Sequence, residues 1–325
     1  MPAAPLLSVQ QRPAAAKSPT VINVLRLRWT CGFLTAAAIA VCAVQAGSQE
    51  KTVNPRAAAN ASFPPGSGQQ TADLEGVSVE VFTYQPTECA VSGALLVFHG
   101  LERNAEAYRN YAIPLGQQLC MLIVAPLFDN ARFPTWRYQR GGIVSGDGSV
   151  QPSKSWTVNL VPRLVSWIRR TQSRANLPYS LIGHSAGAQF LSRVAAFAQD
   201  EATQTVIANP STWVRPSLDI AAPYGFKGIS DRAWGEAALR RYLATKITVL
   251  LGQEDVGSRN LATSEEAEEQ GSTRLERGQN VFREAETAAH QNGWAFNWHL
   301  AVVPGVGHSA RTMFGSVQAL DALRP

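Results

Sequence analysis

Short apolar segments alternate with longer, helix-like segments along most of the chain. Residues 77–84 (VSVEVFTY) alternate apolar and polar side chains with a period of two, which predicts a half-buried strand. Further short segments are almost wholly apolar, which is typical of strands that a parallel sheet buries on both faces. These segments are residues 95–99, 122–125, 179–182, 206–208, 247–251 and 301–303.

Helices are predicted between these strands, where apolar residues recur every three to four positions. The predicted helices are residues 104–118, 156–171, 186–202, 231–241 and 265–292. Pro162 should either kink the second helix or lie in its first turn, because proline has no backbone N–H to donate. The alternation of strands and helices predicts a three-layer α/β fold with a mostly parallel sheet.

Two connections, at residues 128–155 and 210–241, are longer than the usual few residues. Long ordered loops at the carboxyl ends of parallel strands commonly shape a ligand site. We therefore predict that these loops form a substrate pocket, with Trp136, Tyr138 and Trp213 as its aromatic lining. The alternative for these three aromatics is that they cover the core.

The N-terminal segment has the layout of an export signal. A basic stretch precedes an apolar one at residues 29–44, and Val44-Gln45-Ala46 places small residues where a signal peptidase cuts. We therefore predict a signal peptide at residues 1–46, which would make the protein periplasmic or secreted. The alternative is a retained membrane anchor at residues 29–46, since this length is close to what spans a bilayer.

The rest of the chain divides into a linker and one folded domain. Residues 47–75 are rich in Ala, Ser, Gly, Gln and Pro and lack periodicity, which predicts a flexible linker before a domain at residues 76–325. The formal charge of +5 arises mainly before the linker, because residues 1–46 carry four basic side chains and no acidic one. The near balance of charge that remains gives little support for a nucleic-acid partner.

Two cysteines, Cys89 and Cys120, remain after the predicted signal peptide is removed. Each precedes a strongly apolar run, so neighbouring parallel strands would bring both sulfurs to the same sheet edge. An oxidising compartment would allow them to form a disulfide. Two buried free thiols are the alternative, because the sequence does not give the geometry that a bridge requires.

The segment Gly183-His184-Ser185-Ala186-Gly187 matches the pattern G-x-S-x-G. It lies between a predicted strand and a predicted helix, where a nucleophilic serine occupies a sharp turn and small residues allow close approach. The helix N-terminus also directs free N–H groups and the positive end of the helix dipole toward a developing oxyanion. We therefore predict that Ser185 is a nucleophile.

A serine nucleophile needs a base, and the base needs an orienting acid. Of the five histidines, His308 follows the last predicted strand through a flexible Pro-Gly-Val-Gly loop, and we predict that it is the base. With a G-x-S-x-G elbow, the acid lies between serine and histidine in the chain. Asp255 fits, in the loop after residues 247–251, and Glu254 is its rival.

The oxyanion of an acyl-transfer intermediate needs two N–H donors. Ala186, directly after the serine, is predicted to supply one. Leu101, in the loop after residues 95–99, is predicted to supply the other, with Gly100 and Glu102 as alternatives. No metal or cofactor is expected, because the histidines do not cluster with cysteine or carboxylate at ligand spacing.

Several segments together resemble the α/β-hydrolase superfamily over residues 77–320. The segments FHGLERNAEAYR, APLFDNARFP, GHSAGAQF, ANPSTW and PGVGH are similar to bacterial enzymes related to polyhydroxybutyrate depolymerases and feruloyl esterases. The resemblance implies an α/β-hydrolase fold with an eight-stranded sheet, and it implies ester hydrolysis. It also implies that the triad is Ser185, Asp255 and His308, with Leu101 and Ala186 as the oxyanion donors.

The predicted function is thus that of an exported serine hydrolase that cleaves a small-molecule or polymeric carboxylic ester through an acyl-enzyme. An amidase or peptidase would use the same triad, and a non-catalytic binding protein could use the same scaffold. A membrane is an expected partner only if the N-terminal segment stays uncleaved. The motifs predict a reaction and leave the substrate open.

Overall fold

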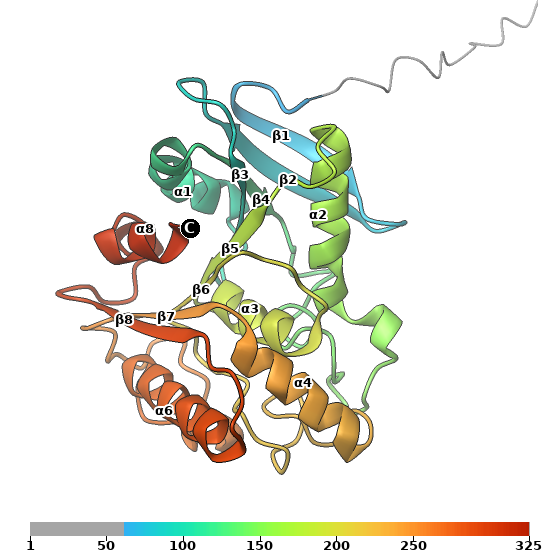
Figure 1. Ribbon diagram of the computed structural model, residues 1–325, viewed down its shortest axis with the longest axis vertical. Coiled ribbons are helices and arrows are strands. Elements are labelled where there is room, and N and C mark those ends of the chain that lie inside the picture. The colour runs from blue at the N-terminus through green and yellow to red at the C-terminus, as the bar shows by residue number, and fades with distance from the viewer. Residues whose placement is uncertain (1–61, 325) are drawn as a thin grey trace, which may run out of the picture. The chain divides into compact units, whose positions relative to one another are not determined.

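The apolar segments of the sequence form the strands of one eight-stranded sheet with the order β1-β2-β4-β3-β5-β6-β7-β8 (Figure 1). The computed structural model describes residues 62–324. The first two pairings, β1 with β2 and β2 with β4, are antiparallel and the others are parallel, which confirms the predicted fold class. The strands are β1 Gly66–Asp73, β2 Ser78–Gln85, β3 Gly93–Phe98, β4 Met121–Pro126, β5 Tyr179–His184, β6 Thr205–Ala208, β7 Ile247–Gly252 and β8 Trp298–Val303.

Helices cover both faces of the sheet. One face packs against α1 (Ala105–Leu119), α7 (Ala310–Phe314) and α8 (Val317–Leu323). The other packs against α2 (Leu160–Thr171), α3 (Ala186–Phe197), α4 (Arg232–Ala244) and α6 (Arg274–Asn292). Among residues 62–324, no helix has the length and apolar character needed to cross a bilayer.

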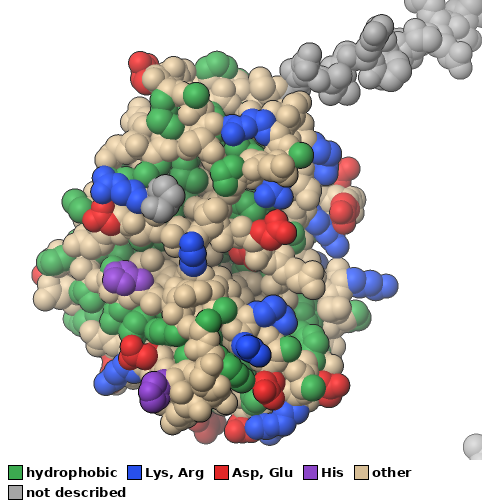
Figure 2. Space-filling model, in the orientation of Figure 1, with side chains coloured by type: hydrophobic (Ala, Val, Ile, Leu, Met, Phe, Trp, Pro, Cys, Tyr) green, Lys and Arg blue, Asp and Glu red, His purple; other side chains and the backbone are tan. Residues whose placement is uncertain are grey.

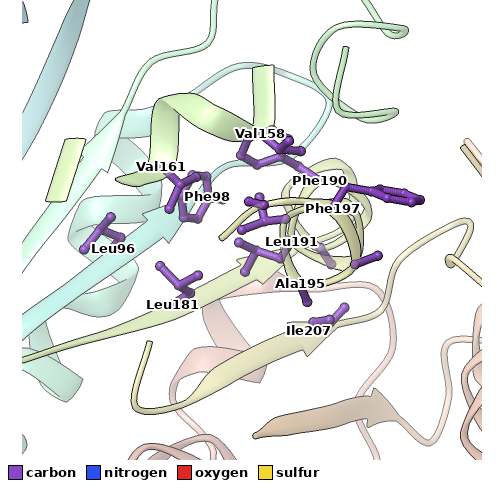
Figure 3. Close-up of a cluster of buried hydrophobic side chains, with 14 of the residues drawn as sticks. Leu96, Phe98, Val158, Val161, Leu181, Phe190, Leu191, Ala195, Phe197 and Ile207 are labelled. Atoms are coloured by element: carbon purple, nitrogen blue, oxygen red, sulfur yellow. The ribbon is translucent and has the colours of Figure 1, made fainter. Parts of the chain in front are cut away.

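The two faces explain why the central strands are mostly apolar. In β3, Leu96 and Phe98 join the core under α2 and α3, whereas Leu95 and Val97 join the core under α1. Successive side chains of a strand point to opposite faces, so a strand with a core on each side favours apolar residues at every position. Figure 3 shows Leu96 and Phe98 among the side chains of α2, α3, β5 and β6.

Three predicted helices have clearly different bounds in the structure, and the one predicted at residues 186–202 ends at Phe197, as α3. The helix predicted at residues 265–292 is two helices, α5 (Glu265–Glu268) and α6, separated by a turn in which Gly271 has φ +139°. Thr273 caps α6 by accepting a hydrogen bond from the Glu276 N–H at 3.1 Å. The segment 156–171 begins with short 3₁₀ turns, and Pro162 lies in the first turn of α2, where a missing N–H costs little.

The linker prediction fails at its C-terminal end. Residues 66–73 form β1, which pairs along its whole length with β2. Its sequence, GSGQQTAD, lacks an apolar pattern because β1 is an edge strand whose side chains are mostly exposed, Ala72 excepted. Phe63 is also buried, with its ring edge-on to Trp167 at 5.3 Å. The folded domain therefore begins before residue 76, and the predicted signal peptide lies outside the described residues.

Cys89 and Cys120 form a disulfide in the structure, with Cα atoms 5.8 Å apart. Cys120 ends α1 in the left-handed conformation, directly before β4, and Cys89 lies in the loop before β3. The bridge therefore joins the N-terminal ends of two neighbouring parallel strands.

Figure 2 shows basic and acidic side chains interspersed over the face in view, in keeping with the balanced charge of this part of the chain.

Candidate active site

The serine of the G-x-S-x-G motif lies on a strained turn between β5 and α3. Ser185 has φ 57° and ψ −115°, which is unfavourable for a residue with a Cβ. The glycines of the motif make this turn possible. A Cβ on Gly187 would lie 2.2 Å from the carbonyl oxygen of Phe98, and a Cβ on Gly183 would lie 2.7 Å from the carbonyl of Gly187.

Three side chains that the sequence places far apart meet at this turn. His308 Nε2 is 3.0 Å from Ser185 Oγ, and His308 Nδ1 is 2.7 Å from Asp255 Oδ2. The Asp255 side chain is 1 % exposed and that of His308 is 30 % exposed. The carboxylate is thus buried behind an imidazole whose other nitrogen faces the serine, the geometry in which histidine accepts a proton from a hydroxyl.

The loops after β7 and β8 are joined by backbone hydrogen bonds. This arrangement determines which of the two candidate acids, Glu254 or Asp255, lies beside His308. The Glu254 N–H donates to the Val306 carbonyl at 2.9 Å, and the Gln253 N–H donates to the Val303 carbonyl at 3.0 Å. A Cβ on Gly252 would lie 2.4 Å from the Val306 oxygen, so only glycine allows the loops to lie this close. In this arrangement Asp255 contacts His308, whereas the Glu254 side chain points to solvent.

The ring of His184 packs against the ring of His308, with centroids 4.5 Å apart. His184 Nδ1 lies 3.2 Å from the Tyr108 hydroxyl. Burial, and next electrostatic interaction with His308 and with Arg274, lower the pKa of His184 well below its usual value. His184 is therefore uncharged, and its ring limits the movement of the His308 imidazole by packing against it.

His99 holds the loop that carries Leu101. Its Nδ1 lies 3.0 Å from the Gly100 carbonyl oxygen, and its Nε2 accepts the Phe128 N–H at 3.1 Å. Burial lowers the pKa of His99 to about 4, so the ring is neutral near pH 7 and its Nδ1–H can donate to Gly100. Among residues 62–324, no backbone carbonyl accepts from the N–H groups of Leu101 and Ala186. Both remain available to an oxyanion.

A cavity of about 220 Å³ opens beside Ser185. Its apolar surface comes from Leu101 and from Tyr108 and Tyr111, which are one helical turn apart on α1. Glu102 and Arg311 are charged residues of the lining, and the Arg311 guanidinium lies over the Tyr111 ring at 5.1 Å. The lining therefore combines apolar and aromatic side chains with one acidic and one basic group.

The predicted aromatic lining is wrong for Tyr138 and Trp213, which are 0 % exposed and lie in the core. We call the loop directly after β3, which carries Leu101, the oxyanion loop. Tyr138 packs under this loop, and its hydroxyl donates a hydrogen bond to the His99 carbonyl at 2.9 Å. Trp136 is half-buried and is not among the residues that line the cavity beside Ser185. The long loops fold back over the sheet, so their aromatics extend the core instead of facing a ligand.

The sequence analysis named Leu101, Ser185 and His308, which line the cavity, but it missed Tyr108 and Tyr111, although these two carried a signal. Tyr108 and Tyr111 follow the oxyanion loop at a spacing of three, which places both on one face of a helix that begins there. Nothing in the sequence pointed to Arg274, which contacts Asp255.

His290 and His299 are exposed, and within residues 62–324 no group of His, Cys, Asp and Glu is arranged to hold a metal ion.

Two solved structures are similar to this chain over most of their length. The poly(3-hydroxybutyrate) depolymerase LpqC from Bordetella parapertussis is 30 % identical, with a TM-score of 0.73 over 81 % of this chain and 92 % of that one. Poly(aspartic acid) hydrolase-1 from Sphingomonas sp. KT-1 is 29 % identical, with a TM-score of 0.73 over 80 % of this chain and 98 % of that one.

A more distant structure, the fluorophosphonate-binding serine hydrolase FphF from Staphylococcus aureus, shares only the fold. It is 12 % identical, with a TM-score of 0.50 over 81 % of this chain and all of that one (100 %). No protein-family model and no curated protein matches the sequence.

The two rival acids give a direct test of the site. Asp255→Asn removes the charge behind His308 and should lower kcat by about 10³–10⁴-fold, because the amide favours the wrong imidazole tautomer. Glu254→Gln should change kcat by no more than about two- to threefold, as for a surface substitution. Steady-state hydrolysis of a nitrophenyl ester by the two variants measures both effects. Equal losses in the two variants would contradict the assignment of Asp255.

Proposed function

We propose that this chain, which belongs to the α/β-hydrolase superfamily, is an exported serine hydrolase that cleaves carboxylic esters. Hydrolase activity in general rests on the two relatives at 29–30 % identity, which are named as a depolymerase and a hydrolase. The observation that carries the more specific proposal is the continuous contact from Ser185 Oγ through His308 to Asp255, at 3.0 and 2.7 Å. A non-catalytic binding protein would not need a serine, a histidine and a carboxylate in continuous contact.

In the proposed mechanism, Ser185 Oγ attacks the ester carbonyl carbon while His308 Nε2 takes the hydroxyl proton. The N–H groups of Leu101 and Ala186 stabilise the oxyanion that forms, and each such donor contributes about 3–4 kcal/mol to the transition state. His308 then gives its proton to the leaving alcohol. A water molecule, activated by the same imidazole, attacks the acyl-enzyme and regenerates the serine, while Asp255 keeps the ring oriented.

Amide hydrolysis is the second candidate, and one observation favours it. The relative from Sphingomonas is named as a hydrolase of poly(aspartic acid), which is a polyamide, whereas LpqC is named as a depolymerase of a polyester. The same serine, base and oxyanion donors serve both reactions, since the two differ mainly in the leaving group that the histidine protonates. We favour the ester because the sequence segments that resemble esterases surround the proposed site.

The role of Ser185 is tested by Ser185→Ala. The variant keeps a Cβ on the turn and should fold normally, but it should lose roughly 10⁵–10⁶-fold in kcat, because within residues 62–324 no other hydroxyl is hydrogen-bonded to the His308 side chain. Turnover of a nitrophenyl ester, labelling by a fluorophosphonate probe, and thermal unfolding as the control for folding measure the outcome. Wild-type protein that folds but takes no label would favour a binding protein instead.

The size of the cavity predicts a preference for short acyl groups. At about 220 Å³ it is smaller than the roughly 300–1,000 Å³ of typical ligand pockets, so a long chain would have to leave it. We expect kcat/KM for a nitrophenyl butyrate to exceed that for the laurate by at least about tenfold. A matched butyryl anilide in the same series separates esterase from amidase. Equal values for butyrate and laurate would show that the acyl chain lies elsewhere.

Export is proposed from the N-terminal sequence and is supported by the disulfide. A bridge such as Cys89–Cys120 persists in oxidising compartments and is rare in reducing ones. We expect N-terminal sequencing of the exported protein to begin at Gly47, with Cys89 and Cys120 unreactive toward a maleimide before reduction. A membrane-bound product that retains residues 29–44 would instead establish the anchor.

A further inference from the structure

A buried arginine from α6 lies against the acid of the proposed triad. Arg274 Nη1 is 3.3 Å from Asp255 Oδ1, and both side chains are 1 % exposed. The other carboxylate oxygen, Oδ2, faces His308 Nδ1 at 2.7 Å. Each oxygen of Asp255 therefore has its own cationic or N–H partner, so the carboxylate plane cannot rotate without losing one of them.

The same guanidinium also holds the loop that follows Asp255. Arg274 Nη2 donates to the Arg259 carbonyl at 2.6 Å, and Nη1 lies 3.3 Å from the Gly257 carbonyl. The next residue of this loop, Asn260, lines the cavity beside Ser185. Arg274 is the first residue of α6, so its position is set by a helix and not by a loop. One side chain thus connects the acid, its loop and a rigid element.

We propose that Arg274 is a positioning residue that fixes the Asp255 carboxylate toward His308 and sets the lower pH limit at which His308 acts as a base. The inference rests on the proposed function. A cation beside Asp255 offsets part of the negative charge that His308 experiences, so it opposes protonation of the imidazole. Without it, the imidazolium is favoured and the neutral base exists only at higher pH.

Among the titratable groups around the His308–Asp255 pair, Arg274 is the buried cation that can oppose protonation of His308. His184 stays uncharged, since burial lowers its pKa well below the usual value. Tyr108 also stays uncharged, since burial raises its pKa above the usual range. Burial lowers the pKa of Arg274, and the Asp255 charge opposes that shift. The remaining titratable groups of the lining are Glu102 after β3 and Arg311 on α7, which are exposed and therefore screened by solvent, and Tyr111 on α1, which is half-buried.

The chain offers a matched control in Arg277, one helical turn along α6. Arg277 is as buried as Arg274, at 1 % exposure, and it too binds backbone carbonyls, with Nη1 2.6 Å from Ser211 O and Nε 2.7 Å from Gly271 O. Its side chain makes no hydrogen bond to Ser185, His308 or Asp255 among the described residues. Arg277→Gln should therefore lower stability without affecting the pH range of catalysis.

The test is the pH profile of kcat/KM for a short nitrophenyl ester in wild type, Arg274→Gln, Arg274→Lys and Arg277→Gln. Arg274→Gln should move the acid limb up by about 0.5–1 pH unit and lower kcat by roughly 10–100-fold, with KM nearly unchanged. Arg274→Lys keeps the charge, so its acid limb should lie at the wild-type position. An acid limb that stays in place in Arg274→Gln, or that moves equally in Arg277→Gln, would overturn the proposal.

A double-mutant cycle covers the case in which Arg274→Gln does not fold. In the Asp255→Asn background the neutral pair leaves no buried charge unpaired, so Asp255→Asn/Arg274→Gln should fold. If Arg274 acts through Asp255, the double variant should have the same kcat as Asp255→Asn, within about twofold. A further loss of tenfold or more would mean a purely structural role. Failure of the proposed function has a separate signature, because Ser185→Ala would then keep its turnover.

Discussion

The close approach of α3 to the carboxyl end of the sheet is the constraint on which the rest of the site depends. Gly187 packs against the carbonyl of Phe98 with no room for a Cβ, and this contact forces Ser185 into a left-handed conformation. The strain brings the hydroxyl above the sheet edge and leaves the N–H of Ala186 free at the helix N-terminus. The position of the proposed nucleophile, one proposed oxyanion donor and the direction of the helix dipole all follow from a single packing contact.

A second group of contacts holds the loops that meet this turn. The loops after β7 and β8 share a backbone hydrogen bond from Glu254 to Val306, so the loops that carry the proposed acid and the proposed base are tied to each other. On the opposite side, neutral His99 ties the oxyanion loop to the backbone at Phe128. Loops are usually the variable part of a fold, but here each is bonded to a neighbour at the point where it carries a functional group.

Buried arginines complete the support of the site. Arg193, Arg274 and Arg277 are each at most 1 % exposed, and all three donate to backbone carbonyls of loops at the carboxyl edge of the sheet. A guanidinium can satisfy several carbonyls at once, which suits it to fix irregular backbone that has no ladder partner. Only Arg274 also touches a carboxylate of the proposed triad, so the framework and the chemistry meet at that residue.

The sequence alone predicted the fold class, the elbow at Ser185, and the loops that carry Asp255 and His308, because apolar periodicity and glycine spacing are local properties. It failed where the outcome depends on distant neighbours. Edge strand β1 has no apolar pattern and forms because β2 offers a partner, and Tyr138 and Trp213 lie inside because their loops fold back over the sheet. The sequence favoured Asp255 over Glu254 by its position in the loop, but it left a disulfide and free thiols as alternatives. In the tertiary structure Asp255 contacts His308, and Cys89 is bonded to Cys120, because side-chain direction and sulfur separation are set by strands that are not neighbours in the chain.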